Sequence, residues 1–156
     1  MAANEAPSAR QILESDAGTW DVDVEVRPVP GADPQKSRGI SVNRLVGGRW
    51  LVSDFRNETS GFEGHGVYGW DATKGKYTGV WVDAMRSFLA IAEGSYDPAT
   101  ATMTLAAEAQ LPDRVLRWRE VTERPDEDTR IYRSIFVLPD GGEFETMTAT
   151  YRRRRG

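Results

Sequence analysis

His65 is the only histidine in the chain, and its imidazole could act as an acid, a base or a metal ligand near neutral pH. The sequence contains no cysteine, so a zinc site would need several carboxylates to converge on this one side chain. We therefore predict no metal site and treat His65 as a candidate general base. The alternative is a histidine that hydrogen-bonds a neighbouring turn and takes no part in chemistry. Haem ligation by His65 is a third interpretation that rests on the residue type alone, and we predict no cofactor.

Asp83 is the second candidate base. Trp81 and Asp83 are two residues apart, so they share one face of a strand, as do Tyr77 and Gly79. If that face points inward, Asp83 is a carboxylate in a partly apolar interior and needs a cationic or hydrogen-bonding partner. With His65 or Asp83 as the base and Arg119 stabilising a developing anion, the chain would catalyse proton transfer.

Arginines interrupt two otherwise apolar strand faces. Arg117 and Arg119 share one face of their strand, and Arg133 lies between Ile131 and Ile135. Inward arginines could bind the carboxylate of an acid while aromatic walls hold its apolar part. The alternative is an internal network of arginines and carboxylates that satisfies itself and binds nothing. The side chains that we expect to contact a ligand are Trp50, Trp70, Tyr77, Trp81, Arg117, Arg119 and Arg133.

Short strands separated by turns must position these residues. Residues 20–27 alternate strictly between apolar and charged side chains, which predicts a half-buried strand. Gly47-Gly48 predicts a tight hairpin, and residues 61–83 form a second hairpin around a glycine-containing turn. The whole pattern predicts ten strands, at residues 20–27, 40–46, 49–55, 61–71, 76–83, 86–96, 102–107, 115–121, 129–138 and 143–152.

Ten strands joined by short turns, with no helix between them, favour an antiparallel up-and-down barrel. A barrel of this width is not filled by its own side chains, so we expect a cavity. Residues 9–15 predict a short N-terminal helix that covers one end of the barrel. We expect one domain over residues 9–153, a disordered N-terminus over residues 1–8 and a basic tail over residues 154–156.

Composition excludes several classes of function. The formal net charge of −4 argues against binding to nucleic acid, which requires a basic surface. No apolar run reaches the length of a membrane span, and the N-terminus lacks the pattern of a signal peptide. We therefore expect a cytoplasmic protein that does not bind membranes, and we keep a homodimer as one interpretation.

A series of short motifs resembles the DUF1579 family of bacterial proteins between roughly Gln11 and Arg153. The motifs are Gly18-Thr19-Trp20, Gly47 to Leu51, Phe62 to Asp71, Trp81-Val82-Asp83, Gly94 to Asp97, Arg119-Glu120-Val121 and Gly142 to Arg152. The resemblance implies a calycin-like barrel related in shape to lipocalins and fatty-acid-binding proteins. In lipocalins the tryptophan that matches Trp20 packs across the closed end of the barrel, so we expect Trp20 to be a plug.

The leading expectation for function is a barrel that holds a small, largely apolar or amphipathic molecule, with an anion as one interpretation. The alternatives are an enzyme that transfers protons on such a ligand, and a structural protein that dimerises through exposed strands. Fold alone does not choose among them.

Overall fold

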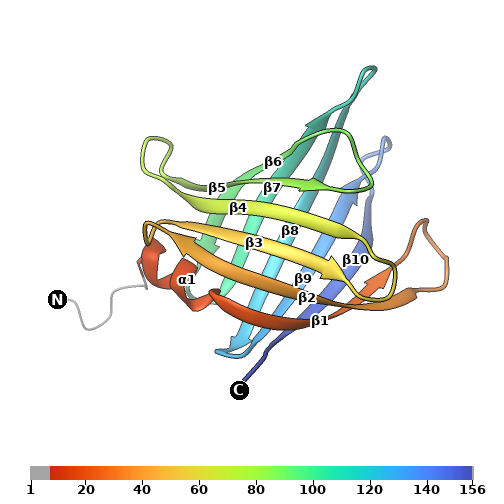
Figure 1. Cartoon of the computed structure of the whole chain (residues 1–156). Helices are drawn as coiled ribbons and strands as arrows, with labels where there is room; N and C mark the ends of the chain where they lie inside the picture. Colours follow the sequence, from red (N-terminus) through yellow and green to blue (C-terminus); the bar gives the residue numbers. More distant parts are fainter. Residues whose placement is uncertain (1–7, 156) are drawn as a thin grey trace.

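A computed structural model describes residues 8–155, which form a closed antiparallel β-barrel (Figure 1). Each strand pairs with the next one along the chain, and β1 also pairs with β10, which closes the barrel. The elements are α1 (Ala9–Ser15), β1 (Gly18–Val26), β2 (Gln35–Val46), β3 (Trp50–Asn57), β4 (Glu63–Asp71), β5 (Lys76–Asp83), β6 (Ala90–Asp97), β7 (Thr102–Gln110), β8 (Val115–Asp126), β9 (Thr129–Val137) and β10 (Glu143–Arg153). The predicted ten-stranded up-and-down, calycin-like barrel with one short helix is confirmed.

Three strand boundaries differ from the prediction by four residues or more. β2 begins at Gln35 because its polar first half pairs with the end of β1. This half has no alternation of apolar residues that would have predicted a strand. β6 begins only at Ala90, so residues 86–89 lie in the connection from β5. β8 continues through Pro125, where a register shift in its pairing with β9 removes the need for a backbone N–H donor.

The pleat of each strand separates the barrel interior from the outside. On β1, Trp20, Val22 and Val24 point inward and are buried, whereas the acidic residues between them face out. On β8 the inward residues are Trp118 and Glu120, and the arginines between and beside them face out. This alternation, fixed by strand register, decides which predicted site residues reach the interior.

Two glycines allow large rings to lie against the inner wall. A Cβ atom at Gly64 would stand 2.0 Å from the ring of Trp81, and one at Gly79 would stand 2.2 Å from the ring of Tyr68. Because glycine has no side chain, the rings lie flat over β4 and β5 instead of projecting across the barrel. The centre of the barrel therefore stays open.

The helix α1 covers the end of the barrel near the β2–β3 turn (Figure 1). Ile12 and Leu13 are its buried residues, and Ile12 belongs to the cluster that includes Tyr77 and Trp118. Ser8 caps the helix: its hydroxyl accepts a hydrogen bond from the backbone N–H of Gln11. Ser8 belongs to the segment for which the sequence predicts disorder; residues 1–7 of that segment lie outside the described residues, and the disorder stays a prediction.

The basic tail is attached to the barrel. The backbone N–H of Arg154 donates to the carbonyl of Thr19, and the side chain of Arg154 pairs with Asp21. Arg155 pairs with Asp128. These pairs are exposed, so each contributes little to stability.

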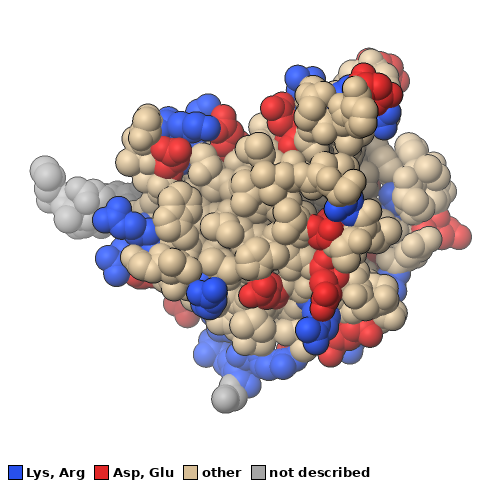
Figure 2. Space-filling model, turned by 45° about the horizontal axis from the view of Figure 1, so that its top comes forward, with Lys and Arg blue, Asp and Glu red and all other residues tan. Residues whose placement is uncertain are grey.

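The outer surface includes apolar side chains as well as ion pairs. Trp50 on β3, Val82 on β5 and Ile91 on β6 are exposed. Figure 2 shows a face of the molecule whose central part carries few charged residues. A homodimer stays a prediction. Within residues 8–155, no helix has the length and hydropathy needed to cross a membrane.

Candidate ligand-binding cavity

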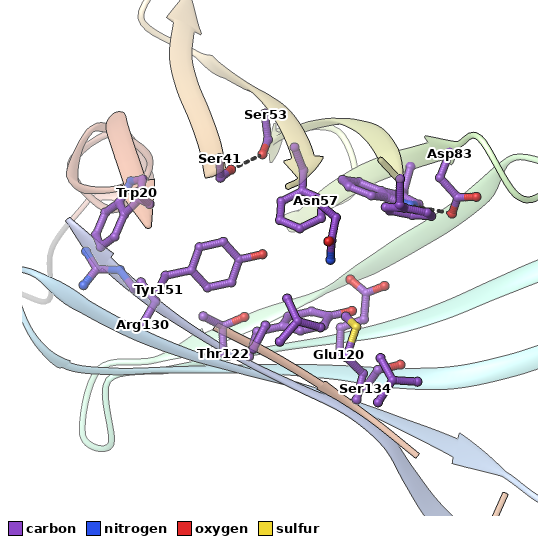
Figure 3. Close-up of a pocket in the computed structure, with 18 of the residues that line it drawn as sticks. Trp20, Ser41, Ser53, Asn57, Asp83, Glu120, Thr122, Arg130, Ser134 and Tyr151 are labelled. Atoms are coloured by element: carbon purple, nitrogen blue, oxygen red, sulfur yellow. Dashed lines mark hydrogen bonds between the residues drawn. The ribbon is translucent and has the colours of Figure 1, made fainter. Parts of the chain in front are cut away.

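The barrel encloses a cavity of about 860 Å³. Figure 3 shows side chains from strands on opposite sides of the barrel pointing into it. Its aromatic lining comprises Trp20, Phe55, Phe62, Tyr68, Tyr77, Trp81, Trp118, Tyr132, Phe136 and Tyr151. Polar groups interrupt this lining at three levels: the end covered by α1, which we call the closed end, the middle, and the opposite mouth.

At the closed end, Trp20 is 1% exposed and lies between two arginines. The guanidinium carbons of Arg130 and Arg153 stand 5.0 Å and 4.3 Å from the centre of its rings. The Trp20 indole N–H donates to the carbonyl oxygen of Asp16 at 3.0 Å. Trp20 is therefore the expected plug, held by cation–π contacts and a hydrogen bond.

Asp16 pairs with the two arginines that line this end of the cavity. Its carboxylate accepts from Arg130 at 2.8 Å and from Arg124 at 2.6 Å. Arg130 donates further to the carbonyls of Asp126 and Thr129, both at 2.8 Å. Both arginines are therefore engaged in closing the barrel, although the buried Nε of Arg124 makes no hydrogen bond within residues 8–155.

Glu120 lies in the middle of the cavity, on the inner face of β8 (Figure 3). The indole N–H of Trp118 donates to its carboxylate at 2.9 Å. Burial raises the pKa of Glu120 above the usual value, and hydrogen bonds from Trp118 and Tyr132 oppose that shift. The Glu120 carboxylate faces the cavity, but the barrel separates it from bulk water. Loss of solvation is therefore the largest cause of the raised pKa.

Three tyrosines face the same space as Glu120. Burial is the largest cause that raises the pKa of Tyr68 and of Tyr132 well above the usual value, and the charge of Glu120 adds to it. Burial likewise raises the pKa of Tyr151 to about 12, again with a contribution from Glu120. The tyrosines are therefore neutral hydroxyls that can donate or accept hydrogen bonds.

Asp83 lies towards the mouth and repeats the arrangement at Glu120. The indole N–H of Trp81 donates to its carboxylate at 3.0 Å, and the backbone N–H of Met85 donates to the other oxygen at the same distance. In both cases a tryptophan donates to an acid two residues later on the same inner strand face. The mouth also includes Lys36, Asn57 and Arg86.

Three of the predicted site residues lie on the cavity wall: Tyr77, Trp81 and Asp83. Trp50 and Trp70 do not line it. Trp50 lies on the outside of β3, where its ring covers Gly69, and Trp70 is 41% exposed with its ring edge against Tyr77.

The predicted arginine clamp does not form, because Arg117, Arg119 and Arg133 all point outward. The pleat that sends Trp118 and Glu120 inward sends both neighbouring arginines out. Each arginine instead makes cross-strand ion pairs on the surface: Arg117 with Glu108, Arg119 with Glu143, and Arg133 with Glu123 and Glu145.

The three candidate catalytic residues are not brought together. His65 lies on the outside of β4, where its Nδ1 stands 2.6 Å from the carboxylate of Asp54 on β3. Asp83 is inside the barrel and Arg119 is outside. The structure therefore does not bring Arg119 together with Asp83, and it places the other candidate base, His65, outside the cavity. Among residues 8–155, no three His, Asp or Glu side chains gather as a metal site would require.

Glu120 is the cavity residue that the sequence reasoning missed. Glu120 is adjacent to Arg119, and the prediction took the face of β8 that carries Arg119 as the inner one. The signal that could have found it is the repeat of tryptophan, any residue, acid at 81–83 and 118–120. Tyr68, Tyr132 and Tyr151 carried no local signal, because aromatic residues are common in any strand.

Comparison with solved structures supports the fold. The structure is similar to that of Rv2717c from M. tuberculosis, with a TM-score of 0.68 and 17% sequence identity over 97% of this chain and 100% of that chain. It is also similar to the S-type phycobiliprotein lyase CPES from Guillardia theta, with a TM-score of 0.60 and 11% identity over 96% of this chain and 94% of that chain. At these identities the likeness shows the fold alone.

No curated protein matches the sequence. The family described as "Protein of unknown function (DUF1579)" matches residues 5–153. This match spans nearly the whole barrel and agrees with the motifs from Gly18 to Arg152. The chain therefore belongs to the DUF1579 family.

Proposed function

We propose that the protein binds a small, largely apolar molecule inside the barrel. The observation that carries this proposal is the cavity of about 860 Å³ with a mainly apolar lining. Pockets for small ligands typically measure about 300–1,000 Å³ and combine apolar walls with a few polar groups. This cavity has both properties.

The open interior is built into the strand sequences. Ten strands give a barrel wider than its side chains fill. Glycines on β4 keep large rings against the wall, and β6 and β7 contribute small inward residues such as Ala92 and Ala107. A chain selected only for stability would fill this space, because close packing stabilises a core.

The solved phycobiliprotein lyase shows that a barrel of this fold can have a biochemical activity. A barrel of this fold and nearly this length has a named activity connected with phycobiliproteins, so the fold is compatible with a role beyond structure. We do not transfer that activity, since the two chains share 11% of their residues.

Native mass spectrometry of the purified protein, with an absorbance scan of the same sample, tests the proposal first. A stoichiometric extra mass would identify a retained ligand, and a Soret band would identify haem. For a protein purified empty, we expect the neutral dye N-phenyl-1-naphthylamine to bind with enhanced fluorescence, because the cavity offers an apolar environment.

A cavity-filling variant makes the test specific. Thr122 faces the cavity, whereas Thr150 lies on the outside of β10 between inward-facing Ala149 and Tyr151. Thr122→Trp should reduce dye affinity at least about tenfold because the new ring occupies the binding volume. Thr150→Trp should bind the dye as the parent does. Equal binding by both variants would place the dye outside the barrel and remove the proposal.

A further inference from the structure

The closed end holds one carboxylate and two arginines, whereas the carboxylates in the middle and at the mouth of the cavity have no cationic partner among the described residues. Asp16 already pairs with Arg124 and Arg130. The carboxylates that remain are Glu120 and Asp83, and no Lys or Arg of residues 8–155 forms an ion pair with either. The lining cations at the mouth are Lys36, which pairs with Glu25, and Arg86, which lies over the ring of Phe88.

Both carboxylates retain unused hydrogen-bonding capacity. A carboxylate offers about four lone-pair positions. Glu120 accepts a hydrogen bond from Trp118, and Tyr132 is a further donor beside it. Its other acceptor positions face the cavity. A buried carboxylate without a cation is costly, so a ligand that supplies donors would gain from meeting it.

The neighbouring rings favour the same kind of group. The rings of Trp118 and Phe136 stack with centroids 5.4 Å apart and planes 9° from parallel, beside Glu120. Aromatic faces carry partial negative charge and attract cations, tryptophan most strongly. The faces of these rings and the carboxylate of Glu120 therefore both attract a positive group, and both repel an anion.

We propose that the ligand is amphipathic and brings a protonated amine, or another cationic N–H donor, to Glu120. Its apolar body lies on the aromatic walls, and Asp83 gives a second contact nearer the mouth. This inference deepens the proposed function and rests on it. It reverses the sign of the sequence-based expectation of an anion, because the arginines behind that expectation are on the outside of the barrel.

Displacement of N-phenyl-1-naphthylamine by three twelve-carbon molecules tests the inference. Dodecylammonium, dodecanol and dodecanoate share one apolar chain and differ in the charge of the head group. We expect dodecylammonium to displace the dye at a concentration at least about tenfold lower than dodecanoate, with dodecanol between them, because a charge-assisted hydrogen bond adds to the shared apolar term. Dodecyltrimethylammonium, which has no N–H, should bind more weakly than dodecylammonium.

Glu120→Gln should reduce the preference for dodecylammonium to about threefold or less, since the amide keeps the shape and loses the charge. Glu123→Gln is the matched control: Glu123 lies on the outside of the same strand, and its variant should keep the full preference. Asp83→Asn should have a smaller effect than Glu120→Gln. Thermal unfolding of each variant shows whether it is folded.

The outcomes separate the two proposals. If the dye does not bind the wild-type protein and no ligand is retained, the proposed function fails. If the dye binds but dodecanoate displaces it as well as dodecylammonium does, the function stands and the cationic ligand is overturned. A preference for dodecylammonium that persists in a folded Glu120→Gln variant also overturns it, because the selectivity would then come from another group. The first comparison needs no variant, so it decides even if Glu120→Gln fails to fold.

Discussion

The closed end and the middle of the barrel both bury charged side chains, but they treat them in opposite ways. At the closed end, Asp16 accepts hydrogen bonds from Arg124 and Arg130, and Arg130 lies over the ring of Trp20. In the middle, Glu120 has an indole donor and no cation. The closed-end network of ion pairs holds its neighbours in one arrangement, although the Nε of Arg124 has no partner in it. A carboxylate that lies beside open volume without a cation is instead costly without a ligand. The difference suggests that the closed end maintains the fold and the middle binds.

The largest effect is expected from Trp20→Ala at the closed end. Removing a fully buried tryptophan costs about 3–5 kcal/mol of unfolding free energy, because the transfer term and the cavity term add. Trp50→Ala is the control, since Trp50 lies on the outside and is 39% exposed. Urea unfolding followed by circular dichroism measures both. Similar losses in the two variants would show that the closed end is not a special source of stability.

Arg130→Met and Arg133→Met compare two arginines of the same strand on opposite faces. We expect a loss of about 3 kcal/mol for Arg130, because its replacement removes one of the two cations of Asp16 and the donor to the carbonyls of Asp126 and Thr129. Arg133 forms partly exposed pairs with Glu123 and Glu145, and its replacement should cost at most about 1 kcal/mol. Chemical denaturation of the two variants measures the contrast. A loss at Arg133 as large as that at Arg130 would contradict it.

Glu120→Gln should stabilise the empty protein by about 1 kcal/mol at neutral pH, the lower end of the cost of an uncompensated buried polar group. Because the folded-state pKa of Glu120 is raised, the folded state holds its proton over a window above the usual pKa of 4.5. Stability from this group is therefore greatest below that window and falls as pH rises through it. The gain from Glu120→Gln should vanish near pH 4. Thermal unfolding of both proteins from pH 4 to 8 measures it, and a gain independent of pH would show that Glu120 is not the cause.

The smallest effect is expected at His65. His65→Ala removes an exposed pair with Asp54, so stability should change by at most about 0.5 kcal/mol and dye binding should not change. Fluorescence titration and thermal unfolding check this. A loss of ligand binding would show that His65 is a functional residue. The outer face of β4 would then have to affect the cavity through the strand.

Much of the fold could be read from the sequence because its signals are local. The alternation from Trp20 to Arg27, the Gly47-Gly48 turn and the glycine-containing turn before Lys76 each depend on neighbouring residues. They predicted the strand count, the hairpin order and hence the closed barrel. The short helix followed from an equally local pattern, and the plug at Trp20 followed from the resemblance to lipocalins. Boundaries such as the start of β2 at Gln35 depended on the partner strand and could not be read in this way.

The site could be predicted only in part, because a strand pattern does not say which of its two faces is inside. A shift of one residue reverses every side chain, and on β8 both faces carry charge: arginines on one, Glu120 on the other. The pairing of β8 with β7 and β9 settled the choice and sent Arg117 and Arg119 outward. The sequence by itself determined that a hollow barrel forms. Only the tertiary structure decided that Glu120 faces the interior while Arg117, Arg119 and Arg133 face out, because that depends on strand register around the closed ring.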